Sequence, residues 1–535
     1  MSQARAHVQA GRLQEAETAY RRIIATYPGF HPAYQELGLM AFAAGKLLWA
    51  ADLFQSAIAL DKNVALYYRN YGEISRRLGR FGEAIKAGAQ ACRLLPSDVD
   101  AHFNFGLACS DAKDDKGSAK AYIKVLELLE QQLANGEASA QMWHMRGVSL
   151  YRLNKVDEAR KSYERALELQ PNFSVALNSL GSLLSDSGLV REALDCFNRA
   201  VALAPEFTMA RLNLGMAQLK LGDWQAGWEN YEARWTGSAE SGNGTFSRPY
   251  CPLPQWDGQG GTEMQGLLVY TEQGFGDMFQ FSRFLESAAR RFAKVAFVCP
   301  DTNTQLLMHS SFGDQVLILK KMPEDFSIWD WHCPLMSLPR AFQTTAENIP
   351  SDIPYLKVST PALLHWQERL NKVASNRYKV GLAWSGRRTH QYDARRSLHF
   401  DQLLPLLGDK RISWVSLQKL GVNDPRPIIP DDTNWIDWTE DLVDFADTAA
   451  LVSNLDLVIS IDSSMVHLAG GVARPVWMLN RFDSEWRWLD RRADSPWYPA
   501  LRIFNQPQQG DWASVLSSVR SALAGILIPE AAEML

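Results

Sequence analysis

One short segment combines glycines with acidic residues at a place suited to proton transfer. It spans Thr271–Phe284, reads TEQGFGDMFQFSRF and follows an apolar run. Gly274 and Gly276 allow a tight backbone turn, and Asp277 stands where a helix should begin. An aspartate at this position commonly caps the helix, but it could also act as a general base that takes a proton from an attacking hydroxyl. Glu272 is a second candidate for that base.

A second segment, ISIDSSMVHLAGG, has the character of a phosphate site. Ser463 and Ser464 offer hydroxyl groups at the predicted start of a helix, whose free N–H groups and positive dipole end attract anions. His467 lies one helical turn further on and could donate to the same oxygens. The alternative is that the serines only cap the helix and that His467 is a core histidine.

A third segment, LAWSGRRTHQYDARRSL, follows another apolar run and is rich in cations. Its arginines, Arg396 among them, and His390 could stabilise the charge of a leaving group, or the segment could be an ordinary solvated loop. Lys419, at the end of ISWVSLQK, is similarly placed for a phosphate or simply for solvent. The only D-x-D pair, Asp98–Asp100, lies far from these segments. We therefore expect a reaction without metal or cofactor, with dipoles and cations stabilising the phosphate.

The elements that must position these residues are strands alternating with helices. Helices are expected between many of the strands, for example at 278–291 and 445–454. This alternation predicts parallel sheets covered by helices, with ligands bound at the carboxyl ends of the strands. We predict a first α/β lobe over 264–360 and a second over 361–535. The predicted strands cover 266–271, 294–299, 315–319, 379–384, 412–417, 455–460 and 475–479.

The first half of the chain is an internal repeat. Glycines at positions 38, 72, 106, 147, 181 and 215 are 34 residues apart, except for one interval of 41. A period of 34 is that of the tetratricopeptide repeat, a pair of antiparallel helices. The longer interval predicts an extension near 130–138. Small and large residues keep the same phase, as at Ala159 and Tyr163, and prolines follow the second helices. We predict a repeat solenoid over 1–235, followed by a Gly-, Ser- and Pro-rich linker over 236–263.

A solenoid of this kind has a concave face that can be a mere spacer or a groove for an extended peptide. Asn70, Asn104 and Asn213 each stand two residues before a repeat glycine. Carboxamides in a row can hydrogen-bond a peptide backbone without reading its sequence, because each offers a donor and an acceptor. The repeats are therefore expected to bind a protein partner through these residues.

Composition excludes several other classes of function. The 535 residues carry 55 basic and 60 acidic side chains, a formal charge of −5, with no basic stripe for nucleic acid. No apolar stretch approaches the length of a membrane span. The six cysteines are widely spaced, with no C-x-x-C, and no export signal is recognisable at the start. We expect a cytoplasmic protein.

Taken together, these motifs resemble a known family. EQGFGDMFQFSRF, VGLAWSG with the later RRS, SLQK, DFADTAALV followed by LDLVISIDSSMVHLAG, and SPWYP resemble tetratricopeptide-repeat glycosyltransferases related to the bacterial heptosyltransferases. The resemblance implies a GT-B fold, two doubly wound α/β lobes with a nucleotide-sugar donor on the second. Some proteins of this layout are similar to bacterial flagellin-modifying transferases, whose repeats hold flagellin and whose α/β part adds a nonulosonic acid.

The resemblance also implies roles for individual residues. It makes Asp277 the catalytic base. It places Asp462, Ser463, Ser464 and His467 at the donor phosphates. Ser385 and Gly386 of the Trp-Ser-Gly turn, with Lys419, are implied to lie on the donor side too.

The resulting hypothesis is a glycosyltransferase that moves sugar from a nucleotide donor to a Ser or Thr hydroxyl of a protein. Flagellin is the specific acceptor that the resemblance suggests. Two alternatives stay open: a non-catalytic scaffold with a degenerate transferase domain, and an enzyme acting on a glycan or lipid.

Overall fold

A computed structural model describes residues 1–136, 138–235, 248–300, 304–310, 312–388, 392–421 and 424–527. The chain forms two compact units. The first is Met1–Leu214 with Ala233–Ser247, and the second is Gly215–Glu232 with Arg248–Leu535. The division falls within a single helix, α13. The predicted domain limits, including a solenoid that ends at residue 235, stay predictions.

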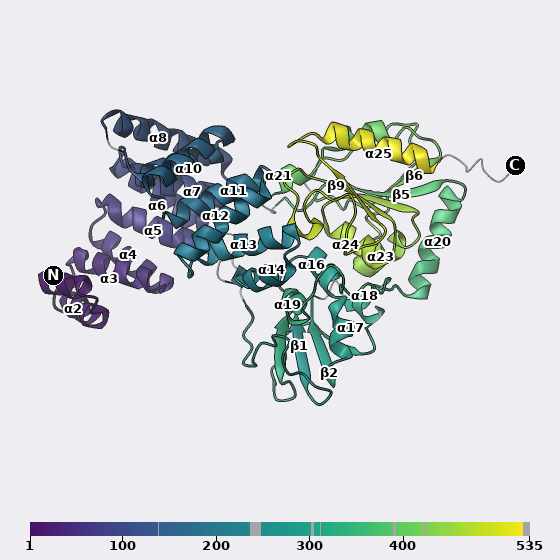
Figure 1. The fold of residues 1–535 in the computed structure, drawn as a ribbon, viewed down its shortest axis with the longest axis horizontal. Helices are drawn as coiled ribbons and strands as arrows, with labels where there is room; N and C mark the ends of the chain where they lie inside the picture. The colour runs from purple at the N-terminus through teal and green to yellow at the C-terminus, as the bar shows by residue number, and fades with distance from the viewer. Residues whose placement is uncertain are drawn as a thin grey trace. The chain divides into compact units, whose positions relative to one another are not determined.

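The amino-terminal region is a series of helix pairs, as the 34-residue period predicts (Figure 1). In the regular repeats the first helix has 13 residues and the second has 14. Helix α8 has 20 residues, so the predicted extension near 130–138 begins as a longer helix. The bounds are α1 Ser2–Gln9, α2 Leu13–Thr26, α3 His31–Ala43, α4 Leu47–Leu60, α5 Ala65–Arg77, α6 Phe81–Leu94, α7 Val99–Asp111, α8 Asp115–Ala134, α9 Ala140–Arg152, α10 Val156–Leu169, α11 Ser174–Asp186, α12 Val190–Leu203, α13 Thr208–Leu221 and α14 Trp224–Tyr231.

Close helix contact explains the residue types that recur. A Cβ atom added to Gly147 would lie 2.5 Å from the ring of Tyr163, so only glycine lets the two helices of that pair approach so closely. Ala159, at the small position of the same pair, is fully buried. Pro171 stands two residues after the end of α10, where proline cannot continue the helix.

The second unit contains a four-stranded parallel sheet in the order β3-β2-β1-β4. Its strands are β1 Gly266–Tyr270, β2 Lys294–Val298, β3 Val316–Leu319 and β4 Trp331–Pro334. Strand β1 is buried along its whole length, as a central parallel strand should be. The helices of this part are α16 Phe275–Phe281, α17 Phe284–Ala289, α18 Thr304–Met308 and α19 Leu338–Ala341.

A six-stranded parallel sheet follows in the order β10-β9-β8-β5-β6-β7. Its strands are β5 Tyr378–Ala383, β6 Ile412–Ser416, β7 Trp435–Ile436, β8 Leu457–Ile461, β9 Val476–Asn480 and β10 Leu501–Asn505. Helix α25 covers one face and shares its core, while α23 and α24 lie on the other (Figure 1). The helices are α20 Thr360–Ala374, α21 Asp393–Arg396, α22 Phe400–Leu403, α23 Phe445–Val452, α24 Ser464–Gly471 and α25 Trp512–Ile526.

The prediction of parallel α/β structure is confirmed, but it missed three strands and one helix break. Strand β4 contains a proline, β7 has two residues, and β10 is interrupted by the exposed Arg502. The helix predicted over 278–291 is two helices, α16 and α17. At the break Ser282 Oγ donates to Phe279 O and Arg283 Nε donates to Gln280 O, so side chains compete for backbone carbonyls.

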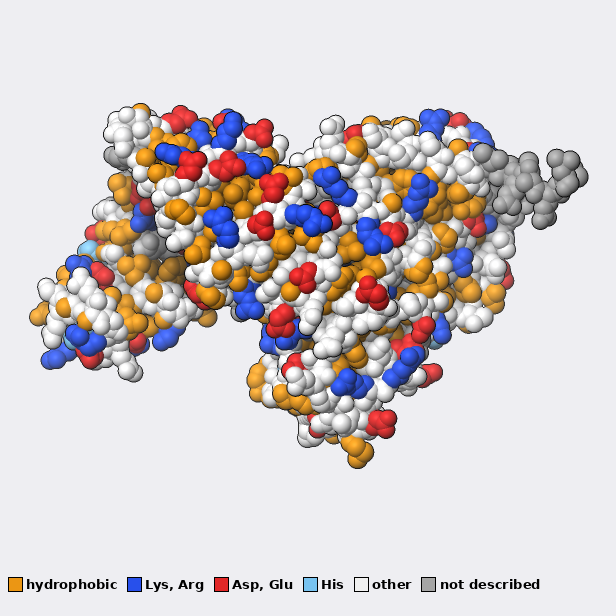
Figure 2. Space-filling view, in the orientation of Figure 1, with side chains coloured by type: hydrophobic (Ala, Val, Ile, Leu, Met, Phe, Trp, Pro, Cys, Tyr) orange, Lys and Arg blue, Asp and Glu red, His pale blue; other side chains and the backbone are white. Residues whose placement is uncertain are grey.

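The described residues contain no helix long and apolar enough to cross a membrane. On the face drawn in Figure 2, basic and acidic side chains are interspersed rather than gathered by sign.

Candidate functional site

The candidate residues follow the carboxyl ends of neighbouring strands in the second unit. In the six-stranded sheet the strand order reverses between β5 and β8, because β6 and β9 lie on opposite sides of that pair. Ser385 and Gly386 follow β5, and Asp462 with Ser463 follow β8. Such a reversal opens the crevice in which parallel-sheet proteins bind ligands. The topology therefore brings two of the predicted segments together.

The segment after β1 meets this crevice through helix α16. A Cβ atom added to Gly276 would lie 2.9 Å from His467 Cδ2 and 3.4 Å from Ser464 Cα, so α16 begins against the first turn of α24. This contact joins the two sheets of the unit at the residues that the sequence singles out. Glycine is needed at 276 because any side chain would separate the helices.

Asp277 is mostly buried at this junction. Its Oδ2 accepts from the Gly274 N–H at 3.0 Å, which is a helix cap, and its Oδ1 forms an ion pair with Arg487 Nη2. Burial raises the pKa of the Asp277 carboxyl above its ordinary value; Glu485 raises it further, and Arg487 opposes both. The capping role that the sequence allowed is therefore present, and the ion pair is additional to it.

Arg487 holds two carboxylates at once. Its Nη1 pairs with Glu485 while Nη2 pairs with Asp277, and its side chain is 6% exposed. Burial alone would lower the pKa of the guanidinium, but Glu485 and Asp277 raise it above its ordinary value. A permanently charged arginine thus sits between two carboxylates that would otherwise repel each other.

His467 is buried and neutral. Its Nδ1 lies 3.0 Å from the Tyr498 hydroxyl, and its ring stacks on Trp488 with centroids 5.2 Å apart. Burial lowers the pKa of the imidazole well below its ordinary value, and the nearby Arg487 and Arg283 lower it further. The hydrogen bond to Tyr498 fixes the ring, so the edge that carries Nε2 faces Gly276.

The start of α24 is capped by its own serine. Ser463 Oγ accepts from the Met465 N–H at 3.3 Å and lies 3.1 Å from Ser460 Oγ. Ser464 is half-buried beside Gly276. Burial raises the pKa of the Asp462 carboxyl, with Glu485 adding to the effect and Arg396 opposing it.

The turn after β5 is fixed by side chains. The Ser385 N–H donates to Gln418 Oε1 at 2.9 Å, and the Gly386 N–H donates to Ser397 Oγ at 2.9 Å. Arg396 Nη1 donates to the Asp462 carbonyl at 3.0 Å, and its guanidinium lies against Gly386. Arg396 thereby ties the turn after β5 to the turn after β8.

The remaining predicted residues, which are the donor-side Lys419, the second candidate base Glu272 and the accessory His390, are more dispersed. Lys419 is exposed, and its Nζ donates to the Leu442 carbonyl at 2.8 Å. Glu272 Oε1 accepts from the Met336 N–H at 3.0 Å, which links the segment after β1 to the one after β4. His390 lies outside the described residues.

The three asparagines of the repeats differ in their surroundings. Asn213 Nδ2 donates to Asn178 Oδ1 at 2.9 Å, so part of its hydrogen-bonding capacity is used within the array. Asn70 and Asn104 are half-buried and make no hydrogen bond to another side chain within the described residues.

Sequence reasoning missed four charged or aromatic residues of the site. Arg487 and Glu485 lie in NRFDSEWRW, which follows β9, and the rule that favoured the segments after β1, β5 and β8 could have found them. Tyr498 lies in the SPWYP motif, and its role as the partner of His467 is visible only in three dimensions. Arg283 is buried beneath Tyr355 and Tyr498, with its guanidinium 4.7 and 4.8 Å from their rings.

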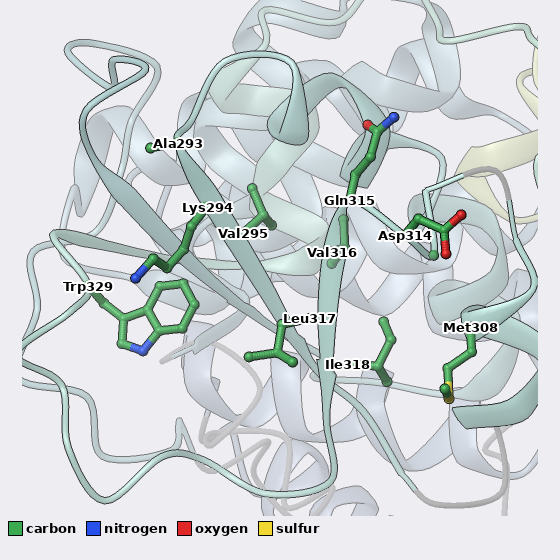
Figure 3. A pocket seen from close by; sticks show the side chains of 11 residues that line it. Ala293, Lys294, Val295, Met308, Asp314, Gln315, Val316, Leu317, Ile318 and Trp329 are labelled. Carbon is green, nitrogen blue, oxygen red and sulfur yellow. The ribbon is translucent and has the colours of Figure 1, made fainter.

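A hollow of about 480 Å³ lies elsewhere, at the edge strand β3 (Figure 3). Val316, Leu317 and Trp329 are among its lining residues, which do not include Asp277 or His467. We assign the site to the junction of α16 and α24, where polar groups converge. Within the described residues no group of three or more His, Cys, Asp or Glu side chains is placed to hold a metal ion, and metal independence stays a prediction.

Comparison with known proteins supports the assignment of the helical region. One model of the tetratricopeptide repeat matches residues 140–173, and a second matches 1–65, 37–99 and 178–235. The amino-terminal region therefore consists of tetratricopeptide repeats, a type of module that binds proteins. A tetratricopeptide repeat protein of Parabacteroides merdae, 16% identical, covers 45% of this chain and 90% of its own, with a TM-score of 0.36.

Two further proteins are similar to this chain over a longer stretch than a single repeat. Protein FlbA of Caulobacter vibrioides is 24% identical over 515 residues, which span 92% of this chain and 84% of FlbA. The protein O-mannosyl-transferase TMTC3 of Homo sapiens is 25% identical over 183 residues, 32% of this chain. The chain spans about a fifth of the length of TMTC3, since the match covers 20% of it.

Proposed function

We propose that this protein is a glycosyltransferase that moves a sugar from a nucleotide-sugar donor to a Ser or Thr hydroxyl of a protein. The observation that carries the proposal is the contact of α16 with α24. It brings a buried carboxylate, Asp277, next to the amino-terminal turn of an eight-residue helix that begins at a switch point of the sheet. A base and a phosphate site side by side are what sugar transfer from a nucleotide requires.

The chemical step needs one proton acceptor and one stabilised leaving group. Asp277 accepts the proton of the acceptor hydroxyl. At the same time the oxygen of that hydroxyl bonds to the anomeric carbon of the sugar. The bond between that carbon and the donor phosphate oxygen breaks, and the electron pair leaves with the phosphate. N–H groups at the start of α24, with Ser464, receive the phosphate. Arg487 lowers the pKa of Asp277 and so opposes the effect of burial.

The proposed reaction uses no cofactor. In this proposal the nucleotide-sugar is a co-substrate, and the leaving phosphate is stabilised without a metal ion. Lys419 and the turn at Ser385 and Gly386 would contact the donor, in line with their position after neighbouring strands.

The repeats supply the protein side of the proposal. They are of a kind that binds proteins, and Asn70 and Asn104 leave carboxamides for a peptide backbone. FlbA matches along nearly the whole chain, so the repeats and the α/β part occur together in that relative as well. The name of TMTC3 describes a protein-directed transferase, which agrees with a protein acceptor for this chain. Flagellin is the acceptor to test first.

A second candidate function, a non-catalytic scaffold, is favoured by one observation. Asp277, Ser463 and His467 each have a structural partner already: a helix cap, a helix cap and a tyrosine. If these were their only roles, the second unit would bind no donor. The two candidates are separated by donor binding and by transfer.

Donor binding is tested by thermal unfolding of the full chain with ADP, UDP, GDP, CDP and CMP, beside the variant His467→Ala. A ligand at 100 times its Kd should add about 2.7 kcal/mol of stability. We expect one nucleotide to stabilise the wild type and not the variant. Stabilisation by none of the five would favour the scaffold.

Transfer is tested with Asp277→Asn. The donor is a nucleotide-sugar that contains the nucleotide found to stabilise the protein, and the acceptor is flagellin. We expect transfer to fall by about 10²- to 10⁴-fold with donor binding retained, because the base is lost. The matched control is Asp511→Asn, since Asp511 caps α25 through the Ser514 N–H, at 3.0 Å. If Asp277 only closed the capping box at Gly274, the two variants would behave alike in transfer, because an asparagine oxygen can accept the Gly274 N–H as a carboxylate oxygen does.

A further inference from the structure

In the repeats, a large aromatic residue of the second helix usually packs against the repeat glycine of the first helix, and the last repeat departs from this. In four repeats, a Cβ atom added to the repeat glycine would meet the ring of this aromatic residue on the following helix. In the last repeat, a Cβ on Gly215 would instead meet the backbone nitrogen of Tyr231 at 2.7 Å. The ring of Tyr231 therefore does not pack against its repeat glycine, unlike the rings of those four repeats. The earlier ring contacts are Gly38 with Phe54 at 2.8 Å, Gly106 with Tyr122 at 2.9 Å, Gly147 with Tyr163 at 2.5 Å and Gly181 with Phe197 at 2.6 Å.

Tyr231 belongs to the second unit and is buried there, with 5% of its surface exposed. Its ring lies against Trp486 with centroids 5.3 Å apart, and its hydroxyl accepts from Gln273 Nε2 at 3.3 Å. Trp228 of the same helix, α14, packs edge-on against Trp486 at 5.4 Å. One helix of the last repeat thus holds Trp486 from two sides.

Trp486 and Gln273 are each linked to Asp277 through one further residue. The Arg487 guanidinium stacks on Trp486, 4.3 Å from the ring centroid, and pairs with Asp277. Gln273 precedes Gly274, whose N–H donates to Asp277 Oδ2. Arg487 and the Gly274 N–H hold the Asp277 carboxylate. Tyr231 contacts the residue that precedes each of them in the sequence.

We infer that Tyr231 is a positioning residue for the Asp277–Arg487 pair, so that the last tetratricopeptide repeat contributes to the chemistry as well as to partner binding. The inference rests on the proposed function. The tyrosine orients the carboxylate through Gln273 and Trp486, and it touches neither donor nor acceptor.

The expected consequence is a change in the ionisation of Asp277. The charged groups that act on it are Arg487 and Glu485, and His467 lies against the neighbouring Gly276. If Trp486 loses its contact with the Tyr231 ring, Arg487 moves away from the Asp277 carboxylate. Arg487 then lowers the pKa of Asp277 less, so it offsets less of the rise that burial causes. The pKa of Asp277 then rises, and transfer requires a higher pH.

The test compares Tyr231→Phe and Tyr231→Leu with wild type in the full chain. For Tyr231→Phe we expect kcat to fall about three- to tenfold, the worth of one hydrogen bond, with KM for the nucleotide-sugar unchanged. For Tyr231→Leu we expect about a 100-fold fall, because a misplaced base is costly. In both, the acidic limb of the pH–rate profile should move to higher pH. Each variant loses the bond to Gln273, which precedes the Gly274 N–H that lowers the pKa of Asp277, and Tyr231→Leu also removes the support of Trp486. The control is Tyr163→Phe, the same change at the same repeat position, which should leave kcat and the pH profile unchanged.

Either of two results would overturn the inference: an unchanged pH–rate profile in both Tyr231 variants, or an equal change in Tyr163→Phe. Tyr231→Phe keeps the ring and its packing, so the test stands even if Tyr231→Leu fails to fold.

Failure of the proposed function has a different signature. If the wild type transfers no sugar, the positioning contact is judged by urea unfolding of Tyr231→Leu, Arg487→Gln and the double variant. Non-additive shifts of the unfolding midpoint would support a contact that couples the two residues, and additive shifts would overturn it.

Discussion

Each unit buries an arginine between two carboxylates, and the two clusters differ in the origin of their members. In the repeats, Arg76 pairs with Glu73 three residues earlier at 2.8 Å and with Asp111 of a neighbouring repeat at 2.7 Å. In the second unit, Arg487 pairs with Glu485 and with Asp277, which is 210 residues away. The first cluster follows from helix spacing and the repeat period, whereas the second exists only because two sheets meet.

The two clusters also differ in their electrostatic result. Burial opposes ionisation of Glu73, yet Arg76 and Arg77 leave its pKa below the ordinary value. At Asp277, burial and Glu485 outweigh Arg487, so the pKa is raised, and at Asp111 of the first cluster burial likewise outweighs Arg76 and raises the pKa. A lowered pKa is thus found only at Glu73, to which both Arg76 and Arg77 bond, while one aspartate in each cluster has a raised pKa. What distinguishes the second cluster is its place, since Asp277 follows Gly276, which lies against the first turn of α24.

The largest effect should come from removing the central arginine. We expect Arg487→Gln to cost about 3 kcal/mol of unfolding free energy, the low end of the range for a broken buried pair, because the mostly buried Asp277 and the half-buried Glu485 are left without this cation. Arg76→Gln should cost a similar amount in the repeats. Urea unfolding measures both. Only Arg487→Gln should move the acidic limb of the pH–rate profile for transfer upward, and a matching shift in Arg76→Gln would erase the distinction.

An effect of similar size is expected from acid, through a buried histidine of the repeats. Burial lowers the pKa of His144 to about 4 from an ordinary value of 6.5. The unfolded chain therefore binds a proton between pH 6.5 and 4 that the folded array does not. The histidine's contribution to stability is complete above pH 6.5, and about 3 kcal/mol is lost as the pH falls to 4.

The measurement is unfolding by helical circular dichroism at several pH values in wild type and His144→Phe. The phenylalanine variant should show the shallower decline below pH 6.5. Equal declines would mean that His144 does not titrate in this window.

A repeat glycine should affect stability without affecting transfer rate. Gly147→Ala places a Cβ 2.5 Å from the buried ring of Tyr163, and the overpacking should cost about 1 to 3 kcal/mol. The control is Gly82→Ala in helix α6, where an added Cβ meets nothing within 4 Å. That change should stabilise the array by about 0.5 to 1 kcal/mol. Chemical denaturation distinguishes the signs, and destabilisation by both would contradict the packing argument.

A glycine of the site should show the opposite balance, with the smallest change in free energy. Gly276→Ala would press on His467 and on the backbone of Ser464, displacing α16 from α24. We expect kcat to fall about tenfold, or 1.4 kcal/mol, with a loss of about 1 kcal/mol of unfolding free energy, the low end of the range for overpacking, because the Cβ is less crowded here than at Gly147. Steady-state transfer and thermal unfolding measure the two. A large loss of stability with normal kcat would make Gly276 a packing residue like Gly147.

The sequence predicts most of the fold because its signals are local. The 34-residue period places the helix pairs, and even the longer α8 follows from one interval of 41. Buried strands such as β1 are continuous apolar runs. Strand β10 was missed because Arg502 interrupts the run, and the break between α16 and α17 because it depends on side chains that bond to backbone carbonyls.

The site was predictable only in part. Candidates such as Asp277 and Ser463 stand after strands, so their position could be read from the pattern. Arg487 could have been found by the same rule, but its pairing with Asp277 depends on the meeting of two sheets. The partnership of His467 with Tyr498 likewise joins residues 31 positions apart with no periodic relation. Contacts of this kind have no signature in spacing.

The boundary between the compact units, which falls within α13 before Gly215, has a consequence for exchange of parts. A chimaera that takes a foreign repeat array up to Leu214 would leave Trp228 and Tyr231 with the α/β part, and the aromatic contacts of Trp486 would remain intact. A junction placed after α14 would replace this helix with a foreign one, whose side chains are not matched to Trp486. A change of acceptor by exchange of repeats is therefore expected to succeed only upstream of the last helix, so the array has one portion that can be exchanged and one that must stay with the α/β part.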